Sequence, residues 1–203
     1  MTHSSCACYE WENPSPTVTV EPSPTPTAPP NLIINGGFEW GQGIVPWGYT
    51  QGTGGARPWA NEDEPYMTPY IPYHSRSGQY LVAIGSSQDW QGNVEATSMF
   101  QTVSLVSGTQ YRFEAYYTTL FLPKTTTTCR VWASLDWVEK KDVTVGNSDL
   151  GDPYNFDLLA FDYTPSTTGD AIVGITIKCD DATYEDAGIV GFDDFSLTEV
   201  ITS

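Results

Sequence analysis

Two acidic residues near opposite ends of the chain have the surroundings of metal ligands. Glu39 follows Gly36 and Gly37, a glycine pair that leaves the backbone free to approach an ion closely. Asp193 lies in an alternating run, where we expect it to point inward with apolar neighbours, namely Ile189, Phe195 and Leu197. A lone inward carboxylate is costly, whereas calcium takes roughly six to eight oxygen ligands. The pattern predicts a structural Ca²⁺ that bridges Glu39 and Asp193; the alternative is an Asp193 carboxylate hydrogen-bonded to backbone.

A second group of side chains could bind a sugar. If the predicted strands 109–120, 128–138 and 171–179 lie in one sheet, their polar face carries two aromatic rings, Tyr116 and Trp132. Charged side chains flank these rings: Arg112, Glu114, Arg130 and Asp136. A sugar ring binds to a flat aromatic ring with hydrogen-bonding groups beside it, and an exposed tryptophan is costly unless it is covered or used. We therefore expect a sugar-binding groove here; the alternative is that a loop covers Trp132.

The segment 52–77 is the second candidate for a sugar site. It shows little alternation and is rich in prolines and acids. A loop of this length in a compact domain is usually functional or disordered. Aromatic residues in and just after it could form a rim at one end of the domain: Trp59, Tyr66, Tyr70, Tyr73 and Trp90. The alternative is that these rings only anchor a proline-rich loop.

Four cysteines fall into two unlike pairs, Cys6 and Cys8 near the start and Cys129 and Cys179 further on. On a period of two, each of the later cysteines shares a strand face with apolar residues: Val131, Ala133 and Leu135 for one, Val173, Ile175 and Ile177 for the other. We predict a buried Cys129–Cys179 disulfide, which stabilises the fold by about 4 kcal/mol in the chain-entropy model. Such a bond indicates an oxidising, extracellular compartment; two inert buried thiols are the alternative.

Charge excludes several kinds of partner. The chain of 203 residues has 8 Lys and Arg against 25 Asp and Glu, a formal net charge of −17. This charge repels nucleic acids and anionic membrane surfaces, so a neutral polymer or a cation fits better. No apolar run is long enough for a membrane helix, and the first residues lack the apolar core of a signal peptide. We expect a monomeric fragment of a longer secreted protein.

The chain divides into three parts. Residues 1–10 are expected to be a remnant tail, and residues 11–30 form a Pro/Ser/Thr-rich linker of the kind that joins secreted modules. Residues 31–200 form the domain, with strands predicted at 31–39, 45–51, 79–84, 97–105, 109–120, 128–138, 155–164, 171–179 and 188–199. Almost no helix is predicted. The fold class is therefore all-β, a two-sheet antiparallel sandwich of the jelly-roll type.

Several segments, taken in order, resemble secreted carbohydrate-binding modules of the family 4/9/22 type. They are NLIINGGFE at 31–39, QTVSLVSGTQYRF at 101–113 and FDDFSL at 192–197, while FDYTP at 161–165 and the later cysteine pair resemble the fungal branch. The resemblance covers residues 31–200. It implies a galactose-binding-domain-like jelly roll without catalysis of its own. It also implies a calcium ion held by Glu39, Asp193 and carbonyls near Gly37.

The expected function is non-catalytic binding of a plant or microbial cell-wall polysaccharide, of the β-glucan, xylan or mannan type. The module would target an attached secreted domain to that polysaccharide. One alternative is a structural or adhesive surface protein without a glycan cleft. A less favoured one is a glycosidase, which needs two carboxylates about 5 to 10 Å apart; Glu114 and Asp136 are the candidate pair.

Overall fold

The structure is a computed structural model that describes residues 28–40, 44–50, 59–60, 75–78, 80–86, 88, 91–146, 155–180 and 188–201, with only the backbone at 59–60. The predicted tail 1–10, nearly all of the linker 11–30 and most of the segment 52–77 lie outside these residues. Within the described part of the chain no helix occurs, and so none that could cross a membrane.

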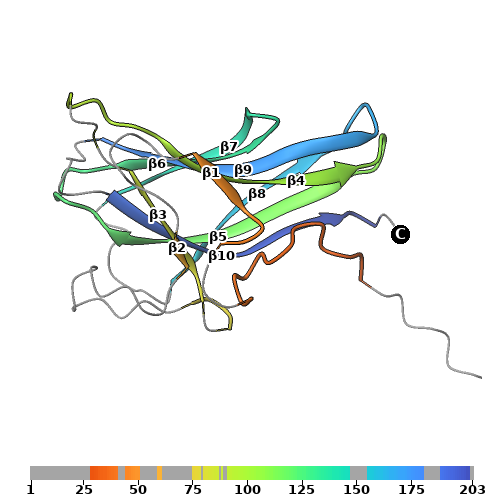
Figure 1. The fold of residues 1–203 in the computed structure, drawn as a ribbon, viewed down its shortest axis with the longest axis horizontal. Coiled ribbons are helices and arrows are strands. Elements are labelled where there is room, and N and C mark those ends of the chain that lie inside the picture. Colours follow the sequence, from red (N-terminus) through yellow and green to blue (C-terminus); the bar gives the residue numbers. More distant parts are fainter. Residues whose placement is uncertain are drawn as a thin grey trace, which may run out of the picture.

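Two five-stranded antiparallel sheets pack face to face, which confirms the predicted all-β sandwich (Figure 1). The first sheet has the order β1 (Gly48–Thr50), β4 (Thr97–Leu105), β9 (Gly169–Cys179), β6 (Cys129–Leu135) and β7 (Val138–Val145). The second sheet has the order β2 (Trp59–Ala60), β3 (Val82–Ser86), β10 (Gly188–Glu199), β5 (Tyr111–Phe121) and β8 (Asp157–Tyr163).

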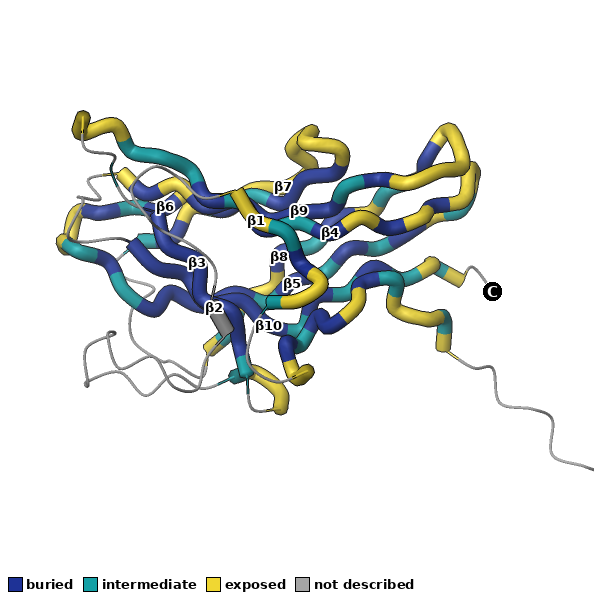
Figure 2. Tube along the Cα trace, viewed as in Figure 1, coloured by how far each residue is buried: buried dark blue, intermediate teal, exposed yellow. Residues whose placement is uncertain are grey.

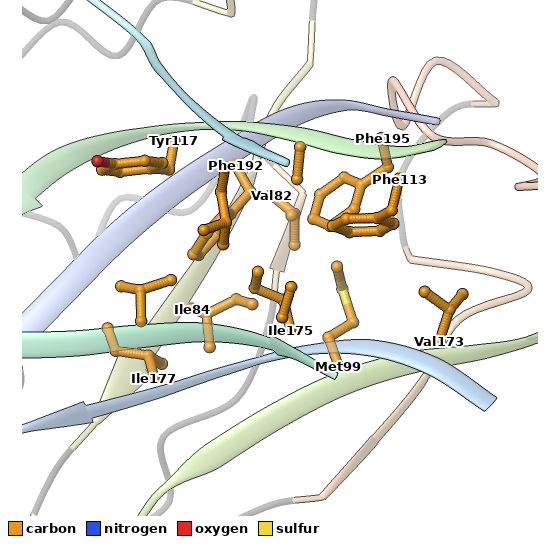
Figure 3. Close-up of a cluster of buried hydrophobic side chains, with 14 of the residues drawn as sticks. Val82, Ile84, Met99, Phe113, Tyr117, Val173, Ile175, Ile177, Phe192 and Phe195 are labelled. Atoms are coloured by element: carbon orange, nitrogen blue, oxygen red, sulfur yellow. The ribbon is translucent and has the colours of Figure 1, made fainter. Parts of the chain in front are cut away.

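Alternation along the strands builds one core between the sheets. In β4 every second side chain, from Thr97 to Leu105, is buried. The inward side chains of both sheets meet in a large apolar cluster that includes Met99, Phe113, Ile175, Phe192 and Phe195 (Figure 3). Full burial of one such side chain stabilises the fold by roughly 1.5–3 kcal/mol. Because the inward side chains of each strand fill this core, side chains that bind a ligand must lie on the outer faces of the sheets or at the ends of the sandwich.

The predicted disulfide is confirmed. Cys129 of β6 and Cys179 of β9 lie directly opposite each other within the first sheet and are bonded. Both are completely buried. Gly188 of β10 packs against the bond from the second sheet, where an added Cβ would lie 2.5 Å from Cys179 Sγ. The bond therefore ties two central strands together inside the core.

Two strand predictions were wrong. Residues 31–39 do not form a strand, because Asn35 and Phe38 adopt positive φ values of 53° and 60°. The segment still runs beside β10 (Figure 1), with Leu32 N bonded to Leu197 O at 2.9 Å and Phe195 N bonded to Gly36 O at 3.0 Å. The predicted strand 128–138 is instead β6 followed by a two-residue turn and β7.

Candidate functional site

The outer face of the first sheet carries Trp132 beside a row of hydroxyl groups. Trp132 of β6 is paired with Thr176 of β9, and Thr176 with Ser98 of β4. Directly opposed residues share one face of a sheet, so these three side chains form one row. Ser98 Oγ and Thr176 Oγ1 are hydrogen-bonded at 2.8 Å. The row, which we call the Trp132 row, combines a partly exposed aromatic ring with two hydroxyl groups, of which Ser98 is partly exposed and Thr176 is buried.

Charged side chains lie beside this row. Arg130, two residues before Trp132, places its guanidinium carbon 5.2 Å from the Trp132 ring centroid. The same guanidinium pairs with Asp142 of β7 at 3.0 Å and with Glu139. These groups are exposed, and exposed ion pairs contribute only about 0–1 kcal/mol to stability. They can therefore exchange partners with a polar ligand at little cost to the fold.

A second row on the same face brings two aromatic rings together. Phe100 of β4 lies between two glycines, Gly48 of β1 and Gly174 of β9. Trp137, from the turn between β6 and β7, packs against Phe100 with ring centroids 5.2 Å apart and ring planes at 67°. Trp137 remains 53% exposed, and the adjoining strand β7 is exposed along most of its length (Figure 2).

The structure does not bring Tyr116 to this face. β5 belongs to the second sheet, so the single polar face predicted from three strands is wrong. Tyr116, Arg112 and Glu114 lie on the outer face of the second sheet, on the opposite side of the sandwich. Arg112 donates hydrogen bonds to Glu114 at 2.7 Å and to Asp162 at 3.1 Å. The predicted groove therefore separates into two unrelated surfaces.

Asp136 lies in the turn after β6, where its contacts are with backbone. Its Oδ1 accepts a hydrogen bond from Ile172 N at 2.9 Å, and its own N–H donates to Ile172 O at 2.7 Å. The proposed catalytic pair is not formed either, because Glu114 lies on the outer face of the second sheet and Asp136 at the end of a first-sheet strand. Glu114 and Asp136 therefore cannot form the carboxylate pair that the glycosidase alternative needs.

Asp193 is completely buried, but on a different side from the one predicted. It lies opposite Tyr116, whose side chain points out of the second sheet. A bulge between Asp193 and Ser196 shifts the alternation, so Phe195 faces the core and Asp193 does not. The segment 75–78 covers it: Arg76 N and Ser77 N donate to Asp193 Oδ2 at 2.8 and 3.1 Å.

Two carboxylates and the aliphatic part of the Glu39 side chain lie around Gly37. A Cβ added at Gly37 would lie 3.6 Å from Asp194 Oδ1, 3.8 Å from Asp193 Oδ1 and 3.8 Å from Glu39 Cγ. Glu39 Oε1 also accepts a hydrogen bond from Tyr80 N at 2.9 Å. The side chains of Glu39 and Asp193 thus both border Gly37.

The charges around Asp193 suit a bound cation. Burial, the largest effect, raises the pKa of Asp193 from 3.8 to about 7, although backbone hydrogen bonds oppose the rise. Asp194 adds negative charge beside it, and Arg76 pairs with Asp194 while its guanidinium lies over the Tyr116 ring. A cation would relieve the cost of an ionised Asp193.

The donor set also determines which cation fits. Among the described residues, no three His, Cys, Asp or Glu side chains form a group that could hold a metal by themselves. Backbone carbonyls or water would have to complete the coordination, which is common for calcium and unusual for structural zinc. The alternative reading of Asp193 has support too, because Asp194 N donates a third backbone hydrogen bond to it at 2.7 Å.

The loop-rim prediction falls mostly outside the described residues. Tyr66, Tyr70, Tyr73 and Trp90 are not among them, and of Trp59 only the backbone, in β2, is described. The sequence offered the loop 74–78, with Arg76 and Ser77, only as a source of a carbonyl ligand to the ion, whereas these residues donate backbone N–H groups to Asp193. Sequence reasoning missed three residues of the two sites: Trp137, Phe100 and Asp194. The dipeptide Asp136–Trp137 lacks the glycine that usually marks such a turn, and the role of residues 75–78 depends on contacts more than 100 residues away in sequence.

The fold is shared with several solved structures. TmCBM61, solved with β-1,4-galactotriose, is 18% identical and matches 84% of this chain and 99% of its own, with a TM-score of 0.53. The CBM22-1 xylan-binding domain of Paenibacillus barcinonensis Xyn10C is 11% identical and matches 88% and 100%, with a TM-score of 0.50.

A Stig cyclase from Fischerella sp. TAU is 13% identical and matches 87% of this chain and 100% of its own, with a TM-score of 0.58. No protein-family model and no curated protein matches the sequence. Identities this low show a common fold alone, and this fold carries both binding modules and enzymes. The chain is therefore a jelly-roll sandwich of the architecture found in carbohydrate-binding modules.

Proposed function

We propose that this chain is a non-catalytic carbohydrate-binding module that binds a neutral polysaccharide on the outer face of the first sheet. The observation that carries this proposal is the Trp132 row, in which an aromatic ring adjoins the Thr176 and Ser98 hydroxyls, with Arg130 beside it. The apolar face of a sugar ring stacks on an aromatic side chain while its hydroxyls bond to polar neighbours.

The ligand class follows from charge and from the shared fold. A net charge of −17 disfavours acidic glycans. Two proteins with this fold are named for neutral glycans, a galactotriose complex and a xylan-binding domain. We place the chain with modules of the family 4/9/22 type, fungal branch, and its ligand among β-glucans, xylans and mannans.

Calcium is the proposed structural ion. The carboxylates of Glu39 and Asp193 would hold it, with carbonyl oxygens near Gly37 completing the set. Bound there, the ion would supply positive charge at a buried carboxylate. It would also join the segment before β1 to the last strand β10. Its role is in stability, because this site lies on the second sheet, away from the Trp132 row.

The remaining proposals concern the cellular setting. The Cys129–Cys179 disulfide is consistent with an oxidising compartment, so we propose that the protein is secreted. The Pro/Ser/Thr-rich segment 11–30 would tether the module to another domain and raise that domain's concentration at the polysaccharide.

Affinity electrophoresis through gels containing xylan, mixed-linkage β-glucan, galactan or galactomannan tests the function. The wild-type protein is expected to be retarded by at least one of them. Trp132→Ala is expected to lose most of that retardation. Tyr116→Ala, the matched variant on the opposite face, is expected to keep it. Each variant is compared at equal folded fraction.

Three results would count against this assignment. Equal retardation of Trp132→Ala and wild type would show that the binding site lies on another surface. Loss of retardation in Tyr116→Ala alone would show that the binding site lies on the second sheet. Wild-type mobility unchanged in every gel would instead favour the structural or adhesive alternative, and release of reducing sugar would show an enzyme.

A further inference from the structure

The turn between β6 and β7 has an unusual conformation for its residues. Leu135 pairs with Val138, so the turn consists of Asp136 and Trp137 alone. Both have positive φ, 49° and 64°. Two-residue hairpin turns of this kind favour Asn-Gly or Asp-Gly, because a left-handed backbone is unfavourable for residues with a large side chain. A tryptophan at the second position is therefore a strained choice where glycine would serve the fold better.

The strained backbone directs the indole onto the outer face of the first sheet. Trp137 contacts Phe100, which lies on β4, two strands away from β6 across β9. Yet the indole is 53% exposed, so it buries much less apolar surface than a core tryptophan. Strained backbone often occurs at ligand sites, and a half-exposed ring held in this way points to binding.

Two neighbouring glycines leave room for the Phe100 ring on the sheet. Gly174 of β9 and Gly48 of β1 flank Phe100 in the sheet and have no side chains. A Cβ at Gly48 would lie 2.7 Å from Phe100 Cε2, so the Phe100 ring lies close against the β1 backbone. A Cβ at Gly174 would lie 2.9 Å from Met99 O. The result is an aromatic corner, with Phe100 as its base and Trp137 as its wall.

Backbone hydrogen bonds fix the wall in place. Asp136 exchanges two hydrogen bonds with Ile172 of β9, one through its N–H and one through its carboxylate. These bonds attach the turn to the middle strand of the sheet. Asp136 is thus a positioning residue, which acts on a ligand only through the orientation of Trp137.

We propose that Trp137 and Phe100 form a second sugar subsite, which stacks one neutral pyranose ring next to the Trp132 row. The proposal rests on the glycan-binding function proposed above and extends it to a ligand longer than one sugar. Ser98 and Phe100 are two residues apart on β4, which separates the two rows by about 7 Å along the strand. A glycan chain lying along β4 and β9 would contact both rows.

Two substitutions separate a binding role from a structural one. Trp137→Gly supplies the residue that the turn favours, and Trp137→Asn supplies another that tolerates positive φ. Both remove the indole. We expect a melting temperature equal to or above that of wild type, with a roughly tenfold weaker association with the retarding polysaccharide. Trp137→Tyr is expected to recover part of the affinity.

The control is Trp40→Ala, which removes a tryptophan that is 69% exposed and lies before β1, outside the first sheet. It is expected to bind as wild type does. For the turn, Asp136→Asn keeps an oxygen acceptor for Ile172 N and is expected to retain affinity, whereas Asp136→Ala is expected to lose it.

The outcomes distinguish this proposal from the function on which it rests. If Trp132→Ala loses binding while Trp137→Gly and Trp137→Asn keep it, the second subsite is wrong and the function stands. A lower melting temperature with unchanged affinity in both Trp137 variants would show a structural role and overturn the subsite. If the wild-type protein binds none of the four polysaccharides, the function and the subsite are both overturned.

Discussion

The raised pKa of Asp193 predicts an unusual pH dependence of stability in the metal-free protein. Burial raises this pKa from 3.8 to about 7. Because the folded-state pKa exceeds the unfolded-state value, the folded protein holds the proton more tightly. The stabilisation from that proton is fully present below about pH 3.8 and is lost as the pH rises through about 7. Stability should therefore fall with rising pH, opposite to the effect of a salt-bridged carboxylate.

The magnitude follows from the shift. One pKa unit corresponds to about 1.4 kcal/mol, so the whole effect is about 4 kcal/mol, of which about 3 kcal/mol is lost between about pH 5 and about pH 8. Other carboxyl groups titrate over the same range, so the quantity to measure is a difference. The free energy of unfolding of wild type minus that of Asp193→Asn isolates the contribution of Asp193.

Urea unfolding in EDTA at about pH 5 and about pH 8 gives this difference. We expect this difference to fall by about 3 kcal/mol at the higher pH. Asp193→Asn also disturbs one of three backbone hydrogen bonds, but that offset is the same at both pH values. With calcium chloride, the wild-type protein should gain stability at high pH and Asp193→Asn should not, because the ion binds the ionised carboxylate.

If the difference in unfolding free energy between wild type and Asp193→Asn is the same at both pH values in EDTA, this reasoning is refuted. That result would mean that the folded protein tolerates an ionised Asp193 because the N–H groups of Arg76, Ser77 and Asp194 satisfy it. The need for a cation would then disappear. Equal stabilisation of wild type and Asp193→Asn by calcium would instead place the ion at a different site.

Three further predictions concern glycines and the disulfide. Gly188→Ala would place a Cβ 2.5 Å from Cys179 Sγ and should lower stability by about 1–3 kcal/mol, with a smaller loss when both core cysteines are alanine. Replacing the Cys129–Cys179 pair, which closes a loop of 50 residues, should cost about 4 kcal/mol in urea unfolding; no loss would contradict the loop-entropy account. Gly78→Ala meets the Glu39 carboxylate at a φ of 65° and should abolish calcium stabilisation in thermal melts, while Gly108→Ala, with a φ of 78° and open space around it, should not.

Alternation was sufficient to predict the strands whose two faces differ most. Strand β4 was predicted with its observed bounds, Thr97–Leu105, and β10 with Gly188–Glu199. The inward direction of Cys129 and Cys179 followed from the same period of two. Alternation failed where backbone conformation, not side-chain polarity, decides the structure. The positive φ of Phe38 ends any strand at 31–39, and the Asp136–Trp137 turn divides the strand predicted at 128–138.

Predicting the site required information that no single strand contains. Alternation shows that Trp132 and Tyr116 each point away from the core, but it does not show which sheet their strands join. That depends on pairing: β6 pairs with β9, whereas β5 pairs with β10 and β8. Two outward aromatics thus lie on opposite faces.

Asp193 shows the same limit within one strand. The bulge after it places Asp193 and Phe195 on different sides of the second sheet, although they are two residues apart. The segment 75–78, more than 100 residues away in sequence, covers it through two backbone hydrogen bonds. A period of two therefore predicts faces reliably between bulges and turns, and those are the places where this chain holds Asp193 and Trp137. The two residues that depart from the pattern are the ones on which the proposed ion site and the second sugar subsite depend.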